Sequence, residues 1–305
     1  MAYSLLITAR EGLEAGLILA IVLSYLARTE QRQHWRPVWL GAAATFLGSL
    51  ALGGILELTA TSLSGAALAA FEGSAMLFAV AVLTGMIFWM KRQAATIGRE
   101  LRAKVDAALR GGSAFALGLL AFTAVGREGL ETVLFLFAGS NTADDAFVYW
   151  LGAGAGLAVA AAIAYVVYAG SARLPLATFF NVTGALLVVL AAGLLVNGLK
   201  ELHEMGAVPN LGPRLWDTYH LIADNSDFGR FLGTIFGYDS SPFLGLVVAY
   251  GAYLVPTLAF FLLGRERLAQ AASRGLVTKG AEAPAGLEEA RQEGACPAVR
   301  AASDG

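Results

Sequence analysis

The sequence predicts an all-α, polytopic membrane protein with seven transmembrane helices. Hydrophobic residues make up 57% of its 305 residues and charged residues only 14%, a composition that argues against a water-soluble protein. Apolar stretches long enough to cross a bilayer, about 20 residues each, recur along most of the chain. They lie at 3–27, 38–58, 71–90, 113–138, 147–169, 177–197 and 242–263.

The first apolar stretch differs from a secretory signal peptide. It has no basic segment before its apolar core, and it carries Arg10, Glu11 and Glu14 within it. We therefore expect it to be retained as a helix. The single cysteine, Cys296, lies near the C-terminus, so no intramolecular disulfide and no thiolate cluster is expected. Residues 264–305 are rich in alanine, glycine and glutamate, and we expect a disordered tail there.

Basic residues are unevenly distributed among the connections. Those after the first, third and fifth stretches (28–37, 91–112 and 170–176) hold ten basic residues and three acidic ones, whereas the alternate connections hold three and eight. Because basic short loops stay on the cytoplasmic side, we expect the N-terminus outside and the C-terminus in the cytoplasm.

The pentapeptide REGLE occurs twice, at 10–14 in the first stretch and at 127–131 in the fourth. In the predicted topology these two stretches run antiparallel. Residues 1–90 and 113–197 then form two three-helix units of opposite topology, the inverted repeat of many secondary transporters, whose site lies at the repeat interface. The stretch at 242–263 adds a seventh helix, and the polar segment 198–241 is expected to form short interfacial helices outside.

Each pentapeptide places its three charged residues on one helix face, because successive residues of an α-helix turn by about 100°. These residues are Arg10, Glu11 and Glu14 in the first motif and Arg127, Glu128 and Glu131 in the second. The glycines at 12 and 129 fall on the far side, where a neighbouring helix could approach closely. An ionised side chain in hydrocarbon costs at least about 2.5 kcal/mol, so six of them require an explanation.

A structural Arg–Glu lattice and a cation site are the two interpretations. Each motif has two acids for one base, which leaves two negative charges that a lattice built only for stability would balance. Oxygen ligands without thiolate suit hard cations, and no histidine lies in a predicted span, unlike the usual copper or zinc site. A di-iron carboxylate enzyme would need Glu-x-x-His, which neither motif contains. The pattern favours cation binding.

Four more glutamates lie at the predicted outer ends of spans. Glu201 and Glu204 are three residues apart, so on a helix they share a face and could capture a cation. Glu57 ends the second span and Glu72 begins the third; together they could form an acidic vestibule that concentrates cations. A solvated helix end is the alternative explanation for each of them.

The doubled REGLE, ELHEMGAVP at 201–209 and FGYDSSP at 236–242 together resemble the oxidase-dependent iron permeases, the high-affinity iron permeases of fungi and their bacterial counterparts. The resemblance covers residues 1–263. It implies a permease and not an enzyme, placed in a bacterial inner membrane and surrounded by lipid. The matching motif positions for iron binding or passage are Glu11, Glu14, Glu128 and Glu131, which Arg10 and Arg127 would hold in place.

The same resemblance implies the substrate and partners. Iron, as Fe³⁺ or Fe²⁺, would be the transported substrate, with no tightly bound cofactor and no nucleic acid. A separate extracytoplasmic oxidase or peroxidase and an iron-binding partner would supply the ion after oxidation. Transport of lead or manganese, a membrane-embedded iron redox subunit, and a purely structural subunit remain as alternatives.

Overall fold

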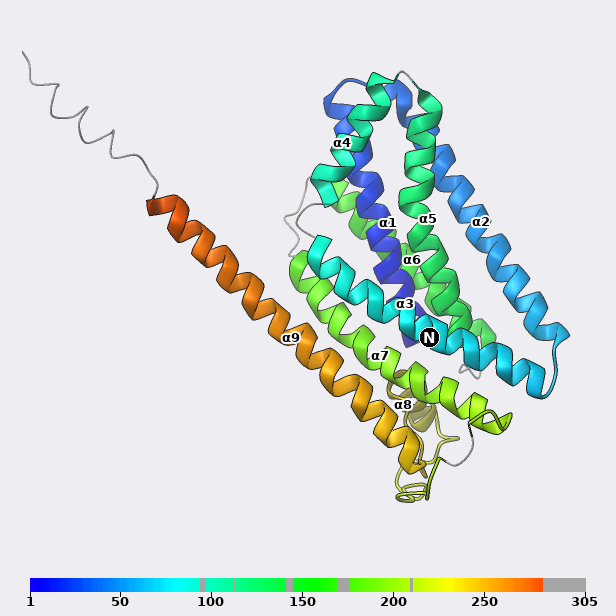
Figure 1. Ribbon diagram of the computed structural model, residues 1–305. Helices are drawn as coiled ribbons and strands as arrows, with labels where there is room; N and C mark the ends of the chain where they lie inside the picture. The colour runs from blue at the N-terminus through cyan, green and yellow to red at the C-terminus, as the bar shows by residue number, and fades with distance from the viewer. Residues whose placement is uncertain (94–96, 112, 141–144, 169–175, 209–210, 282–305) are drawn as a thin grey trace, which may run out of the picture. The chain divides into compact units, whose positions relative to one another are not determined.

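The computed structural model describes residues 1–93, 97–111, 113–140, 145–168, 176–208 and 211–281. The elements in these residues are α1 (Ala2–Arg28), η1 (Arg32–His34), α2 (Trp35–Ser62), α3 (Ala66–Gln93), α4 (Ile97–Arg110), α5 (Ala114–Ser140), α6 (Ala146–Tyr168), α7 (Leu176–Glu204), α8 (Asp227–Phe236) and α9 (Leu244–Ala281) (Figure 1). Met1–Leu258 form one compact unit and Ala259–Gly305 a second.

The prediction of an all-helical, multi-pass membrane protein is confirmed. Within the described residues, five helices are long and apolar enough to cross a membrane, namely α2, α3, α6, α7 and α9. The two REGLE helices, α1 and α5, are 27 residues long, but each carries three charged residues near its middle. A count of seven spans therefore stays a prediction.

Exposed apolar side chains along α2 fit a lipid environment. Leu40, Leu47 and Leu58 are 70%, 65% and 71% exposed, and they lie at intervals along the helix. In water such a row of leucines would be costly, whereas hydrocarbon solvates it without penalty.

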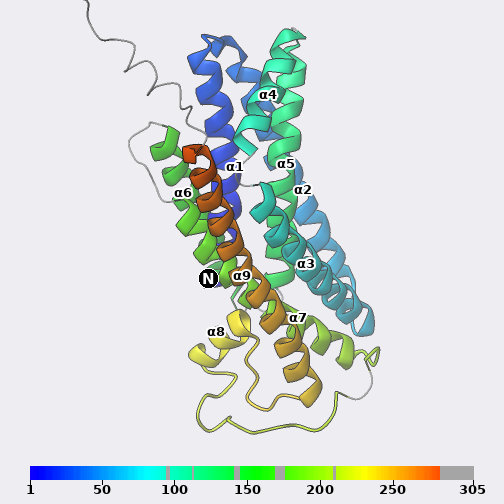
Figure 2. The ribbon, with the colours of Figure 1, turned by 60° about the vertical axis from the view of Figure 1, so that its left-hand side comes forward.

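The helices of the first unit pair in a regular pattern. α1 packs against α6, α2 packs against α5, and α3 packs against α7, while α1 and α5 also contact each other. In Figure 1, α3 crosses in front of α1 and α5, and α6 lies behind them. Figure 2 shows α6 and α3 on opposite sides of that central pair.

Close approach of helices at the motif glycines is confirmed. A Cβ atom at Gly12 of α1 would come within 2.9 Å of the Cβ atom of Ala160 in α6. A Cβ atom at Gly129 of α5 would come within 3.2 Å of Thr45 Cγ2 in α2. The absence of side chains at these two positions allows tight backbone packing, and it turns the opposite, charged faces of α1 and α5 toward each other.

Helix α4 (Ile97–Arg110) lies within the stretch 91–112, for which the sequence predicts only a connection. Leu101 and Val105 are one turn apart and buried, and they join a cluster with apolar residues of α1, α2 and α5. The Tyr25 hydroxyl of α1 donates a hydrogen bond to Asp106 of α4 at 2.5 Å. The amphipathic helix therefore covers the C-terminal half of α1 and the N-terminal half of α5.

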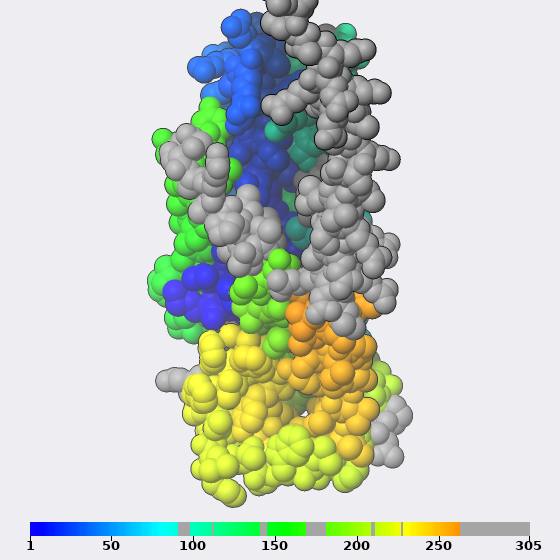
Figure 3. Space-filling model, turned by 90° about the vertical axis from the view of Figure 1, so that its left-hand side faces the viewer, coloured from blue at the N-terminus to red at the C-terminus, as the bar shows by residue number. Residues whose placement is uncertain are grey.

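The polar segment after α7 contains the short helix α8, which packs against α7. Ser226 caps α8 by accepting a hydrogen bond from Gly229 N at 3.0 Å. Gly237 ends it in the left-handed conformation, with φ of 67°. Figure 3 shows this segment in yellow at one end of the face displayed.

Helices α7 and α9 continue furthest past the C-terminal ends of their predicted spans. α7 continues to Glu204, so Glu201 and Glu204 belong to its last turn. α9 continues to Ala281, although the sequence predicts disorder from residue 264 onward. Residues 282–305 of the predicted tail lie outside the described residues.

Candidate functional site

The two REGLE motifs meet at the contact between α1 and α5. All four glutamates are buried, with exposures of 9% or less. The two arginines differ, because Arg10 is 3% exposed whereas the side chain of Arg127 is 35% exposed. The six charged groups predicted to share two helix faces therefore form one interior polar cluster.

In α1, the buried Arg10 binds both glutamates of its own motif. Its Nη1 atom lies 2.5 Å from Glu11 Oε1, and its Nη2 atom lies 3.0 Å from Glu14 Oε1. The second oxygen of Glu11 is buried and has no hydrogen-bond partner within the described structure. Arg10 thus leaves one oxygen of Glu11 free.

The motif of α5 repeats this arrangement. Arg127 Nη2 lies 3.0 Å from Glu128 Oε1, and Arg127 Nε lies 3.4 Å from Glu131 Oε1. The Oε2 atoms of both glutamates are buried without a hydrogen-bond partner in the part of the chain that is described. Each arginine therefore occupies one oxygen per glutamate.

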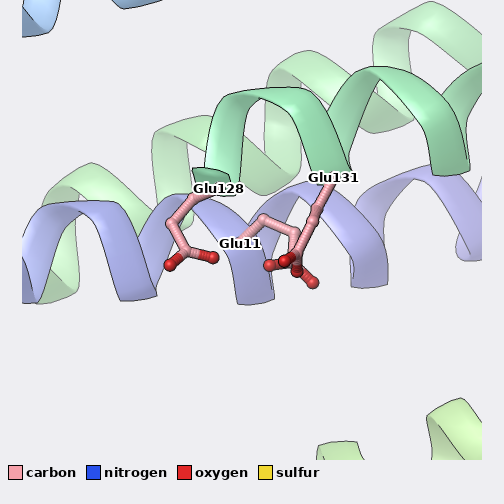
Figure 4. A group of neighbouring side chains, drawn as sticks. All are labelled: Glu11, Glu128 and Glu131. Carbon is pink, nitrogen blue, oxygen red and sulfur yellow. The ribbon is translucent and has the colours of Figure 1, made fainter. Parts of the chain in front are cut away.

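Three of these glutamates converge from the two helices. Glu11, Glu128 and Glu131 each offer one carboxylate oxygen, and these oxygens lie within 4.8 Å of one another. Figure 4 shows Glu11 reaching from α1 and the other two from α5, with the carboxyl groups of Glu11 and Glu131 next to each other. Oxygens that bind one hard cation at about 2.1 Å stand roughly 3–4.2 Å apart, so small side-chain movements would complete such a site.

Glu14 is the fourth glutamate of the predicted site, and it lies outside this group of three. Its carboxylate is held by Arg10 and is 7% exposed. The structure thus brings three of the four predicted residues within 4.8 Å of one another and leaves Glu14 outside that group, although all four pair with an arginine of their own motif and Glu14 Oε1 is also buried without a hydrogen-bond partner among the described residues.

Helix α3 contributes contacts that the sequence does not predict. The Sδ atoms of Met86 and Met90 lie 3.7 and 2.8 Å from the two Nη atoms of Arg10. The guanidinium carbon of Arg127 lies 3.9 Å from the ring centroid of Trp89. Trp89 and Met90 follow Met86 by three and four residues along α3. This helical spacing places the three side chains on a common face, and it is the one signal in the sequence that points to them.

A cavity of about 560 Å³ reaches the site from the side opposite α3. Its lining comes from α1, α2, α5 and α6, is mostly apolar, and includes Glu11 and Glu128. Glu57, near the end of α2, also lines it. Of the four outer glutamates, Glu57 is therefore the one that the structure connects to the motif glutamates through open space.

The other outer glutamates do not line this cavity, although the charge of Glu72 interacts with those of Glu57 and Glu201. Glu201 packs where α3 and α7 cross, because a Cβ atom at Gly73 would come within 3.1 Å of the Glu201 Cβ atom. Glu72 is the neighbour of Gly73 in α3, and Glu204 is exposed in the last turn of α7. None of the three lines the cavity that reaches Glu11.

Comparisons with known proteins show the family of the chain. The iron permease FTR1 family matches residues 1–271. The chain is 36% identical over 274 residues to "Ferrous iron permease EfeU" of Escherichia coli O6:H1, covering 89% of this chain and 98% of the relative. It is 35% identical over 260 residues to the protein of the same name from Yersinia pestis, covering 85% and 92%. No solved structure matches the chain. The chain belongs to the iron permease FTR1 family.

Proposed function

We propose that this protein carries iron into the cell through the site formed by Glu11, Glu128 and Glu131. Membership of an iron permease family makes iron transport the function of the chain, and the geometry supports where the ion passes. The supporting observation is that three buried carboxylates from two helices each keep one oxygen without a hydrogen-bond partner among the described residues. Such oxygens are costly in a dry interior, and a bound cation would offset that cost.

A packing lattice would use these oxygens differently. If the cluster served only to hold α1 against α5, each arginine would be expected to bridge the two helices. Instead, Arg10 binds the glutamates of α1 and Arg127 those of α5. The carboxylates of Glu11, Glu128 and Glu131 come together from the two helices without an arginine that pairs across them in the described residues, which suits a site that an ion occupies transiently.

The ion that crosses is Fe³⁺ in this proposal. Four carboxylates and two guanidinium groups leave two negative charges when all are ionised, and three carboxylates can offset the charge of a ferric ion. A separate extracytoplasmic oxidase or peroxidase would produce it from Fe²⁺ and pass it on with an iron-binding partner. The relatives carry the name ferrous iron permease, so the valence of the transported ion requires a direct test.

The transport path follows from an inverted repeat of α1–α3 and α5–α7, with α9 as the seventh span. The helix pairs support this symmetry, because the contact of α1 with α6 has its counterpart in the contact of α5 with α2. The motif glycines support it as well, since Gly12 faces α6 and Gly129 faces α2. The three-glutamate site then lies between the two repeats. The N-terminus would lie outside a bacterial inner membrane.

In this orientation the cavity occupies the outer half of the first unit. It extends from Glu57 toward Glu11 and Glu128, so Glu57 would attract the ion and the two motif glutamates would receive it. Glu72, Glu201 and Glu204 would add negative charge at the same membrane face and raise the local cation concentration. On the other side, the packed cluster beneath α4 would close the path to the cytoplasm.

Reconstitution tests this proposal. Purified full-length protein in liposomes is supplied with radioactive iron, either as anaerobic Fe²⁺ or as freshly oxidised Fe³⁺, with lead and manganese as competitors. We expect saturable uptake that is faster with Fe³⁺ and weakly inhibited by the other metals. Faster uptake of Fe²⁺ would reverse the assigned valence, and stronger uptake of lead or manganese would reassign the substrate. Absence of any cation flux would contradict the proposal.

A further inference from the structure

The two arginines of the site are both held from α3, although by different chemistry. Arg10 is buried between the sulfur atoms of Met86 and Met90. Arg127 lies over the indole ring of Trp89, at 3.9 Å from the ring centroid, and remains 35% exposed. One helix that bears no residue of the REGLE motifs therefore contacts both guanidinium groups.

The contact of Trp89 with Arg127 uses a part of the guanidinium that the glutamates do not use. A guanidinium group is flat; its N–H donors lie in its plane, whereas an aromatic ring attracts it through its face. Arg127 donates a hydrogen bond from Nε to Glu128 Oε1 at 3.2 Å, its Nη2 atom pairs with the same oxygen at 3.0 Å, and Glu131 Oε1 forms an ion pair with Nε at 3.4 Å. The ring and the two carboxylates can therefore hold Arg127 at the same time.

Arg127 depends on its contact with Trp89 more than Arg10 depends on its contacts with Met86 and Met90. Arg10 is enclosed, with 3% exposure, so neighbouring atoms restrict it on all sides. Arg127 is partly open, and a long, flexible side chain in that position would otherwise sample several rotamers. Movement of Arg127 would release or cover the oxygens of Glu128 and Glu131.

We infer that Trp89 is a positioning residue for iron binding. It holds the Arg127 guanidinium so that this group occupies one oxygen of Glu128 and one of Glu131 and leaves the second oxygen of each free for the ion. This inference rests on the proposed function of the three-glutamate site. It assigns to α3 the role of setting the affinity of a site whose ligands lie on α1 and α5.

The test compares Trp89→Leu and Trp89→Phe in the full-length protein reconstituted in liposomes, with initial uptake rates measured over a range of Fe³⁺ concentrations. Trp39→Leu is the matched control, because Trp39 is 53% exposed on α2 and belongs to no part of the site. Leucine removes the aromatic face, so Trp89→Leu should raise the KM for iron about tenfold while the maximal rate per folded protein changes less than about twofold. Phenylalanine keeps an aromatic face and should restore most of the affinity.

A purely structural role of Trp89 predicts a different result. Misfolding would lower the maximal rate in proportion to the folded protein and leave KM unchanged. An unchanged KM in Trp89→Leu, or an equal rise in Trp39→Leu, would overturn the inference while leaving the proposed function intact. Wild-type liposomes without iron uptake would overturn both.

Equilibrium binding of Fe³⁺, supplied as its citrate complex, adds a second readout. If Trp89 acts through Arg127, then Trp89→Leu should weaken binding in the wild-type background and have no further effect in Arg127→Ala. Such non-additivity is the signature of two residues that act as one unit. Independent, additive effects would contradict the inference.

Discussion

Arg10 and Arg127 make the same ion pairs within their motifs, but their surroundings differ. Removing one partner of a buried ion pair typically costs about 3–5 kcal/mol, and this applies to Arg10→Ala. Arg127 is 35% exposed, so water can replace part of its interaction and Arg127→Ala should lower stability less. The melting temperatures of the purified variants measure this difference.

Both alanine variants should also lower iron uptake by about tenfold or more, because their glutamates lose the groups that fix them. Lysine restores the charge but not the two-pronged geometry, so Arg10→Lys and Arg127→Lys should recover only part of the activity. Wild-type uptake in both alanine variants would show that the arginines do not support the site.

Glu14 provides a graded test of the site. The sequence predicts four equivalent glutamates, whereas the structure places Glu14 outside the group of three that share a space. We expect Glu131→Gln to raise the KM for iron by about tenfold or more, and Glu14→Gln by less than about threefold, since glutamine is a much weaker ligand than a carboxylate. Equal losses of affinity in the two variants would place Glu14 in the binding site as well.

At the scale of helices, the motif glycines allow α1 to approach α6 and α5 to approach α2. A methyl group at Gly12 or Gly129 would be too close to the neighbouring helix, and such overpacking costs about 1–3 kcal/mol. Gly12→Ala and Gly129→Ala should each lower the melting temperature. Gly48→Ala is the control, because no described atom lies within 4 Å of the added Cβ; it should keep or raise the melting temperature. Equal melting temperatures in all three variants would contradict this packing.

The sequence predicts the apolar helices well because their length and composition are dictated by the bilayer. It misses α4, since Leu101 and Val105 are the only buried residues among the described side chains of a stretch rich in charge. It anticipates that the glutamates of each motif share a helix face, because that follows from the helical repeat alone. The contact of Trp89 with Arg127 depends on where α3 crosses α5, which no local pattern specifies.

For the whole molecule, the uneven distribution of basic residues predicts its orientation. With Cys296 replaced by serine, single cysteines at Leu221 and Lys104 can report the two faces, because both side chains are exposed. A membrane-impermeant maleimide applied to intact cells should label Leu221→Cys, which lies between α7 and α8. Lys104→Cys in α4 should react only after the membrane is permeabilised. Labelling of Lys104→Cys in intact cells would overturn the orientation and the proposed inverted repeat.

Iron uptake by the triple variant Glu11→Gln, Glu128→Gln and Glu131→Gln tests the central claim most directly. Glutamine keeps the size of each side chain but removes the negative charges that a cation requires. Each single variant should reduce uptake severely, and the triple variant should be little worse than the strongest single one, because the three residues act as one unit. In liposomes with equal amounts of folded protein, we expect uptake at the background level and only a modest change in melting temperature. Substantial iron flux through the triple variant would contradict the claim that the ion passes between these glutamates.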